Sequence, residues 1–391
     1  MSRNAAVVGI GEVPVGKFPD RQLLDIAITV AEQALEDGGV DRKEVDTLLM
    51  APCFADPWFN TDLGFARLVD ELGMRATVRL NAQVNAGGST GAALLKVAVG
   101  LVESGQSETV LCLHAEKFTN LSGQEGFDFF AKAGIERDFE APFGMAYNAI
   151  PGLTAERYMY ETGTPIEQLA EVSVACREWA SLHPNAMFRK PMTVEDVLAS
   201  KVIASPLHAL MLNMLGDGGS AFVVTTEDRA RSLTETPVYV WGEGDVVSTY
   251  SFAQHDDITR MNWSVAGDRA FQQAGVTPED IDVLEIYIAY PIFHLIIMEE
   301  LGFCARGEAG ALVAAGETRP GGSLPTSTNG DAMSYGHIGA GVGVATLVET
   351  CRQLMDKAGE RQVPGASIAL KTAAGGAYSN ANVAILGREP R

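Results

Sequence analysis

Two glycine-rich segments each precede a predicted helix, and each carries a side chain that can take part in catalysis. Residues 85–91 read Asn-Ala-Gly-Gly-Ser-Thr-Gly and include the hydroxyl of Ser89, a potential nucleophile. Residues 336–341 read Gly-His-Ile-Gly-Ala-Gly and include the imidazole of His337, which can donate or accept a proton. Neither Gly87-Gly88 nor the later pair Gly375-Gly376 has the glycine spacing of a Rossmann or P-loop site, so a dinucleotide or ATP site is not indicated.

Thiol and metal chemistry find little support in the sequence. The five cysteines lie far apart in the chain, at Cys53, Cys112, Cys176, Cys304 and Cys351. This spacing argues against a zinc ribbon, an iron-sulfur site and a disulfide framework, and we expect most of them to be small buried groups. The histidines other than His337 occur singly, without a second ligand at metal spacing, so no metal site is predicted.

Charge and hydropathy restrict the partners and the location. The 391 residues carry a formal net charge of -21, which repels a phosphate backbone, so a nucleic-acid partner is not expected. A phosphorylated small molecule is not excluded, because local cations or helix N-terminal amides can bind one. No run approaches the roughly 18 apolar residues of a membrane span, and the N-terminus lacks a signal-peptide pattern. We therefore expect a cytoplasmic protein.

The elements that must position these side chains alternate between strand and helix, and they occur twice. Residues 7–10 read as a buried strand, and residues 23–34 place their apolar side chains on one helix face. Residues 34–40 and their continuation are matched at a constant offset by residues 270–286, which indicates an internal duplication. Alternating helices and buried strands are typical of a layered α/β protein.

We predict two halves, at residues 1–232 and 233–391. The first half includes an excursion at about 117–205, with helical stretches at 158–161 and 167–179.

Several separated motifs, in order, resemble the thiolase superfamily over nearly the whole chain. They are Val84-Asn85, His114-Ala115-Glu116-Lys117, Asp217-Gly218-Gly219, Asn329, Gly336-His337-Ile338-Gly339-Ala340-Gly341 and Ala374-Gly375-Gly376. The resemblance implies a five-layer αβαβα fold built from two similar halves, with an inserted loop domain in the first half.

The cysteines that the resemblance implies are missing. Thiolases attack an acyl-CoA thioester with a cysteine at the start of the first-half helix, where this sequence has Gly88, and the spacing of the terminal glycines places the second cysteine position at Thr372. Their Asn-Glu-Ala-Phe segment is here Tyr-Ile-Ala-Tyr, residues 287–290. His337 stands at its usual place. Glycine offers no nucleophile, and Ser89 is turned by roughly 100° on the helix, away from the pocket. Ser89 has a sufficient structural role as a helix-start residue that satisfies free amides.

Tyr287 and Tyr335 resemble the tyrosines implicated in catalysis in the lipid-transfer-protein branch, in particular the cysteine-free aldolases of steroid side-chain degradation. Those enzymes cleave a β-hydroxyacyl-CoA by a retro-aldol step. The resemblance makes Tyr287 and Tyr335 candidate proton shuttles, provided that their surroundings lower a pKa near ~10, and makes His337 a donor to the enolate oxygen. Ile288 departs from the acidic residue of that branch, and Tyr290 is interpreted as pocket wall.

The remaining predicted site residues are glycines and Ser89. Gly88, Gly375 and Gly376 can bring backbone amides close to a thioester oxygen, although close packing of the central layers also requires glycine. We include Ser89 with them as a substrate-binding position.

The leading hypothesis is an enzyme that makes or breaks a carbon–carbon bond of an acyl-CoA without a covalent intermediate. The alternatives are a non-catalytic acyl-CoA or lipid-binding subunit, and an acyltransferase that uses a nucleophile other than cysteine. Coenzyme A enters as part of the substrate, and no bound cofactor is expected. The resemblance also implies a homodimer paired through the edge strand at about Thr77 to Val84, and a small partner protein of the DUF35 type, with a zinc ribbon and an OB-fold.

Overall fold

The computed structural model describes residues 4–287 and 289–391, and its framework is a mixed sheet in two parts. The strand order is β3-β2-β4-β7-β1-β8-β11-β10-β9. The two parts meet where β1 pairs with β8, through Ala6 with Tyr239 and Val7 with Val238. The N-terminal part contains β1 (Ala5–Gly16), β2 (Thr47–Met50), β3 (Leu80–Gln83), β4 (Thr109–Lys117) and β7 (Asp217–Thr226). The C-terminal part contains β8 (Val238–Val247), β9 (Val283–Glu285), β10 (Ile368–Gly375) and β11 (Asn380–Gly387).

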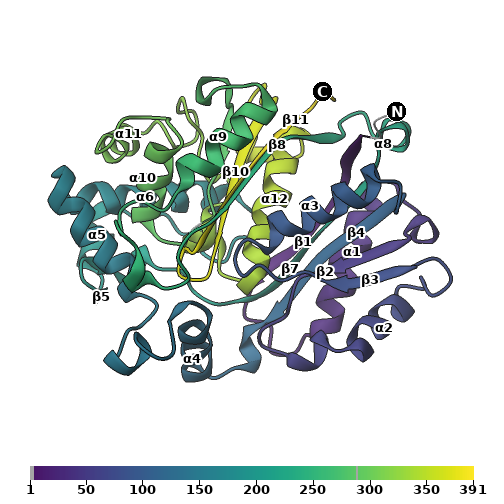
Figure 1. The fold of residues 1–391 in the computed structure, drawn as a ribbon, viewed down its shortest axis with the longest axis horizontal. Coiled ribbons are helices and arrows are strands. Elements are labelled where there is room, and N and C mark those ends of the chain that lie inside the picture. Colours follow the sequence, from purple (N-terminus) through teal and green to yellow (C-terminus); the bar gives the residue numbers. More distant parts are fainter. Residues whose placement is uncertain (1–3, 288) are drawn as a thin grey trace.

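Helices complete the five layers around these strands (Figure 1). Helix α1 (Leu23–Asp37) contacts β1, β4 and β7, and α9 (Trp263–Ala274) contacts β8 and β11. Between the two parts of the sheet, α3 (Thr90–Glu103) and α12 (Val342–Leu354) pack against each other. Because α12 contacts β1 and β7 as well as β9 and β10, the central helices join the halves. The predicted αβαβα fold is confirmed.

The two halves repeat one order of elements. Helix α1 is followed by a short 3-10 turn at Arg42–Glu44 and then by β2, and α9 is followed by a matching turn at Pro278–Asp280 and then by β9. A capping box closes each turn, since the side chain at its N-cap and the carboxylate three residues later both accept backbone hydrogen bonds. The predicted apolar face of residues 23–34 is buried in α1. The structure therefore contains the predicted duplication as a repeated helix, turn and strand.

The excursion of the first half covers the second half. It contains α4 (Gly123–Gly134), α5 (Ala149–Thr162), α6 (Ile166–Leu182), α7 (Val194–Ala199), and the short strands β5 (Val202–Ala204) and β6 (Leu207–His208). The predicted helical stretches fall inside α5 and α6. Helix α6 packs against α10 (Pro291–Glu300) and α11 (Ala309–Ala314), which belong to the C-terminal half.

Two further helices belong to the first half: α2 (Asp62–Glu71), which contacts α1, and α8 (Glu227–Leu233), which contacts β1 and β7. The boundary predicted between residues 232 and 233 falls at the end of α8, and this division of the chain stays a prediction. Within residues 4–287 and 289–391, no helix combines the length and the apolar character needed to cross a membrane.

Candidate active site

A cavity of about 280 Å³ lies where the glycine-rich segments of the two halves meet. Five predicted site residues line it: Gly88, Gly375, Gly376, Tyr287 and His337. Tyr335 and Ser89 are not among its lining residues. The full lining is Phe54, Gly87, Gly88, Gly123, Gly126, Tyr147, Asn148, Leu212, Asn213, Leu215, Tyr287, Ala289, Tyr290, His337, Gly339, Ala340, Ala374, Gly375, Gly376 and Tyr378. The sequence analysis thus identified three glycines, Tyr287 and His337 of the lining as site residues, but not most of the other lining residues.

Gly88 is in close contact with the C-terminal half. A Cβ atom added to it would lie 2.1 Å from the carbonyl oxygen of Ala374 and 2.9 Å from Cε1 of Tyr287. Both separations are far below van der Waals contact, and the first involves backbone that cannot swing aside. No side chain fits at residue 88 unless both neighbours move, so a nucleophile there is excluded by packing as well as by the residue type.

His337 is held as a neutral hydrogen-bond donor. Its backbone N–H donates to the Met214 carbonyl at 2.8 Å, and its carbonyl accepts from Gly216 N–H at 3.0 Å. The ring Nδ1 accepts from Gly339 N–H at 3.1 Å, so a neutral ring carries its proton on Nε2. Burial lowers the pKa of His337 to about 4, against the opposing effect of the Asp331 carboxylate. The imidazole is therefore neutral near pH 7.

Tyr287 lines the cavity as a neutral phenol. Burial is the main cause that raises its pKa above the usual value, and the nearby Tyr147 and Asp331 raise it further. Its ring centre lies 6.3 Å from that of His337. The lowered pKa on which a tyrosinate base depends is absent here, so Tyr287 can donate or relay a proton but does not carry a negative charge near pH 7.

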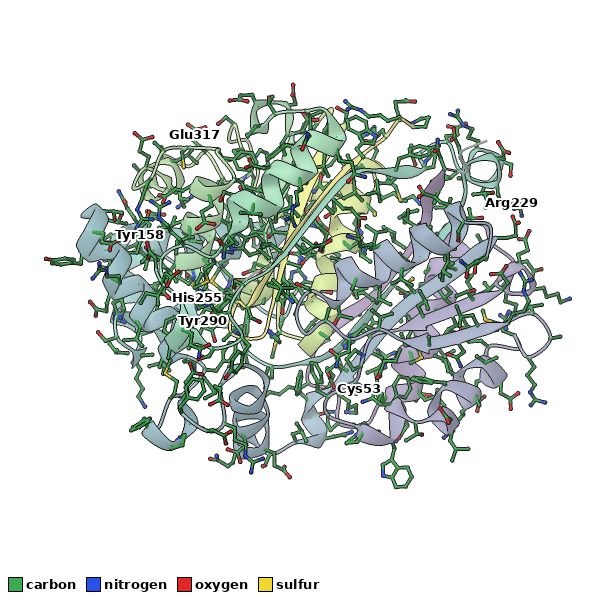
Figure 2. The ribbon with its side chains drawn as sticks, viewed as in Figure 1. Cys53, Tyr158, Arg229, His255, Tyr290 and Glu317 are labelled. Atoms are coloured by element: carbon green, nitrogen blue, oxygen red, sulfur yellow. The ribbon has the colours of Figure 1, made fainter. Side chains whose placement is uncertain are left out.

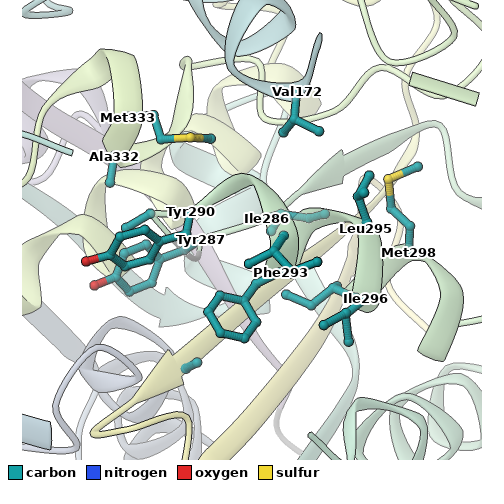
Figure 3. Close-up of a cluster of buried hydrophobic side chains, with 14 of the residues drawn as sticks. Val172, Ile286, Tyr287, Tyr290, Phe293, Leu295, Ile296, Met298, Ala332 and Met333 are labelled. Carbon is teal, nitrogen blue, oxygen red and sulfur yellow. The ribbon is translucent and has the colours of Figure 1, made fainter. Parts of the chain in front are cut away.

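Further tyrosines surround the cavity, and the sequence analysis missed two of them, Tyr147 and Tyr378. The Tyr147 hydroxyl donates to the Gly376 carbonyl at 2.8 Å, and the Tyr290 hydroxyl donates to Asn148 Oδ1 at 2.6 Å. Figure 3 shows the rings of Tyr287 and Tyr290 directed the same way from the start of α10. The position of Tyr378 just after Gly375-Gly376 was a usable signal. Tyr147 and Asn148 come from the excursion, which carries no motif, and Asn213 comes from the segment between the excursion and β7.

Tyr335 is buried away from the cavity. Its hydroxyl donates to Glu12 Oε1 at 2.8 Å, and its ring packs edge-on against that of His183, with ring centres 5.4 Å apart. Burial and the Glu12 carboxylate raise the pKa of Tyr335 well above its usual value. The structure does not bring Tyr335 together with Tyr287 and His337, because its side chain points toward β1. Thr372 is also buried without lining the cavity, and Ala374 of the same strand lines it instead.

The predicted amide-satisfying role of Ser89 is wrong. Ser89 is the N-cap of α3, but its side chain makes no capping bond and instead donates to Asn380 Oδ1 at 2.9 Å. The same Oδ1 accepts from Gly375 N–H at 2.6 Å. Thr90 bonds the loop, since its hydroxyl accepts from Ala86 N–H and donates to the Gly87 carbonyl. Ser89 and Asn380 therefore tie the start of α3 to Gly375 at the end of β10.

The cysteines take no part in the cavity. Cys53, Cys112, Cys176 and Cys351 are buried, as predicted, Cys304 is half-buried, and all five are free thiols. Cys53, labelled in Figure 2, donates to the buried Glu116 carboxylate at 3.0 Å. Burial and Glu116 raise the pKa of its thiol well above the usual value. Thiolate chemistry therefore finds no support in the part of the chain that the structure describes.

The chemistry available in the cavity is that of neutral donors. Among the described lining residues there is no Asp, Glu, Lys, Arg or Cys. The hydroxyl of Tyr287 and Nε2–H of His337 can donate to a carbonyl or enolate oxygen in the cavity. The sequence difference at Ile288 falls outside the described residues. The arrangement suits a reaction that develops an oxyanion and needs no charged nucleophile.

Comparison with known proteins agrees with this fold. Residues 5–211 match the family model described as "Thiolase, N-terminal domain", and residues 244–388 match the one described as "Thiolase C-terminal domain-like". An acetyl-CoA acetyltransferase of Methanothermobacter thermautotrophicus is 32% identical over 99% of this chain and 100% of its own length. A steroid side-chain-cleaving aldolase of Thermomonospora curvata is 30% identical over 89% of this chain and 90% of its own.

A solved structure is similar over the whole chain as well. The "Ltp2-ChsH2(DUF35) aldolase" matches with a TM-score of 0.86 and 28% sequence identity, covering 99% of this chain and 98% of that chain.

Proposed function

This chain belongs to the thiolase family, and we propose that it cleaves or forms a carbon–carbon bond of an acyl-CoA thioester by an aldol-type step without an acyl-enzyme. The observation that carries the proposal is the contact of Gly88 with Tyr287 and Ala374, which leaves no room for a nucleophilic side chain. The aldolase relatives support it as well. The acyl group and the preferred direction of the reaction are not part of the proposal.

The proposed cleavage balances without a charged base. The β-hydroxyl loses its proton, the bond between Cα and Cβ breaks, a ketone or aldehyde forms at Cβ, and the electron pair enters the thioester enolate. The enolate carbon then takes up one proton, so the step consumes and releases none overall. A neutral Tyr287 hydroxyl can relay that proton by accepting from the β-hydroxyl while it gives up its own. Nε2–H of His337 would donate to the enolate oxygen.

The test is product analysis on β-hydroxyacyl-CoA substrates, both short-chain and steroidal, with a DUF35-type protein present. We expect a shorter acyl-CoA together with a ketone or aldehyde. The Tyr287→Phe variant should lose about 10²-fold in kcat, the usual size of a proton-transfer contribution, and keep its affinity for the CoA ester. Absence of cleavage across both substrate classes would contradict the proposal.

Acyl transfer is a second candidate, because a relative at 32% identity is named an acetyl-CoA acetyltransferase. Such a reaction would leave an acylated protein, detectable by mass spectrometry and lost in Ser89→Ala. The Ser89 hydroxyl points to Asn380 instead of the cavity, which favours the aldol-type route. Detection of an acylated Ser89 peptide would favour acyl transfer over the aldol-type route.

Partner proteins form part of the proposal. The similar solved structure is named as an Ltp2-ChsH2(DUF35) aldolase, and we propose that a DUF35-type protein likewise binds this chain and adds substrate-binding surface. The described lining offers no lysine or arginine to the phosphates of coenzyme A, which leaves this contact to a second protein. We also propose a homodimer paired through the edge strand β3. Light scattering coupled to size exclusion, with and without the partner, tests both assemblies.

A further inference from the structure

The backbone beside Tyr287 is strained at three places. Ala289, Ser327 and Asp331 have positive φ angles of 67°, 53° and 47°. Residues with a Cβ atom adopt this left-handed region rarely, and they stay in it only where surrounding contacts hold them. All three lie next to the cavity in two segments, the first made of residues 284–287 and Ala289, the second of residues 327–331. Strain of this kind gathers at functional positions.

Hydrogen bonds from the second segment hold the first on both sides of Tyr287. Ser327 N–H donates to the Leu284 carbonyl at 2.8 Å, and Ser327 Oγ donates to the Ile286 carbonyl at 3.1 Å. On the other side, Asp331 Oδ2 accepts from Ala289 N–H at 3.2 Å. Ile286 on one side of Tyr287 and Ala289 on the other are thus held by Ser327 and Asp331, and these contacts restrict the direction of the Tyr287 side chain.

The Asp331 carboxylate is itself held in place. It is 1% exposed and begins the short π-helical turn Asp331–Tyr335, against which α6 packs. Its backbone N–H donates to Asn329 Oδ1 at 2.8 Å, and His294 Nε2 of α10 lies 3.2 Å from the same Oδ2 that Ala289 uses. A buried carboxylate is costly unless its partners are well placed. Asp331 does not line the cavity, so any effect on the reaction passes through another residue.

We propose that Asp331 is a positioning residue that sets the Tyr287 ring against Gly88 by holding Ala289 in its left-handed conformation. The inference rests on the proposed function, in which Tyr287 relays the proton. It also gives a purpose to a buried acid that the proposed reaction does not otherwise use. Neither the sequence motifs nor the lining of the cavity identifies Asp331.

The kinetic test compares Asp331→Ala with Asp331→Asn. The alanine variant loses the acceptor for Ala289 N–H, and we expect kcat to fall at least 30-fold with KM within about 3-fold of wild type. The asparagine variant keeps an oxygen acceptor and should recover at least one third of the wild-type kcat. The matched control is Asp282→Asn, because Asp282 lies two residues before the first segment and accepts from the backbone N–H groups of Ser367 and Ile368. This control should keep wild-type kcat.

A double variant separates positioning from a general structural effect. If Asp331 acts through Tyr287, then Asp331→Ala in a Tyr287→Phe background lowers kcat by less than 3-fold, because the positioned hydroxyl is already gone. If Asp331→Ala lowers kcat at least 30-fold in the Tyr287→Phe background as well, the proposal is overturned.

A crystal structure of Asp331→Ala tests the positioning role without any measurement of turnover. We expect the φ angle of Ala289 to turn negative and the Tyr287 ring to leave its contact with Gly88. An unchanged ring would overturn the positioning role even if the enzyme proves to be an aldolase. A displaced ring in a protein without aldolase activity would support the positioning role and contradict only the reaction.

Discussion

At Gly88, any larger side chain would have to share space with the Ala374 carbonyl oxygen and the Tyr287 ring. The missing nucleophile is therefore part of a packing arrangement in which tyrosine occupies the space beside the helix start. Restoring a cysteine at residue 88 would require compensating changes on β10 and at residue 287. The residue types at positions 88 and 287 are therefore coupled by packing.

The first prediction concerns Gly88→Ala. The added methyl group overlaps the Ala374 carbonyl, so we expect a loss of about 1–3 kcal/mol in the free energy of unfolding, measured in urea. The control is Gly100→Ala in α3, the helix that follows Gly88, where an added Cβ atom meets no atom within 4 Å. That control should be neutral or stabilising by up to about 1 kcal/mol. Equal effects of the two substitutions would contradict the packing argument.

Tyr335→Phe tests the reassignment of Tyr335. The substitution removes the hydrogen bond to Glu12, so the free energy of unfolding should fall by about 1.5–3 kcal/mol, as for a bond to a charged group. Because the hydroxyl does not face the cavity, kcat should stay within about 3-fold of wild type. A loss of kcat as large as that of Tyr287→Phe would restore the catalytic role suggested by the resemblance.

The pKa of His337 makes stability depend on pH. Burial lowers this pKa to about 4, whereas an unfolded chain has a histidine pKa near ~6.5. Between these two pKa values, His337 binds a proton in the unfolded chain but not in the folded chain. The contribution of His337 to stability is therefore fully present above pH ~6.5 and is lost as pH falls toward 4. His337→Gln should make the slope of unfolding free energy against pH shallower by up to about 1.4 kcal/mol per pH unit. An identical slope in both proteins would contradict this assignment.

The elements show what the sequence could and could not predict. Local patterns predicted α1, the duplicated turn and strand, and the two glycine-rich helix starts, because each depends on apolar periodicity or on backbone conformation within a few residues. The direction of the Ser89 side chain depends on Asn380, 291 positions away in sequence. Tyr147 reaches the cavity only because the excursion folds over the second half. Contacts between residues far apart in the chain cannot be predicted from local sequence patterns.

The link between Ser89 and Asn380 joins the start of α3 to β10 and β11, and it can be tested as a pair. Asn380→Ala removes the acceptor of Ser89 Oγ and of Gly375 N–H, so the free energy of unfolding should fall by about 1–3 kcal/mol. Ser89→Ala should cost about 1 kcal/mol, and the double variant less than the sum of the two. Strictly additive losses in chemical denaturation would show that the two side chains act independently.

Over the whole molecule, a buried ionic network holds the two halves together. Arg352 of α12 lies 3.4 Å from Glu12 of β1 and 2.9 Å from Glu349, and Arg361 also contacts Glu349, at 2.8 Å. Burial acts to raise the pKa of Glu349, but the guanidinium groups of Arg361 and Arg352 hold this pKa well below its usual range. Strand β1 belongs to the first half and α12 to the second, so this network joins the repeats through their centre.

Arg352→Ala should therefore disturb the whole chain. It removes the arginine that pairs with the buried Glu12 and one of the two that pair with Glu349, and breaking a buried pair in this way costs about 3–5 kcal/mol in the free energy of unfolding. Arg388→Ala is the control, because Arg388 pairs with an exposed Asp356 at the surface, where loss of an ion pair costs about 1 kcal/mol or less. Chemical denaturation followed by fluorescence and by circular dichroism measures both variants. If the halves depend on this network, Arg352→Ala separates the transitions seen by the two probes, whereas Arg388→Ala keeps them coincident. A loss no larger than that of the surface pair would mean that the central helices alone hold the repeats together.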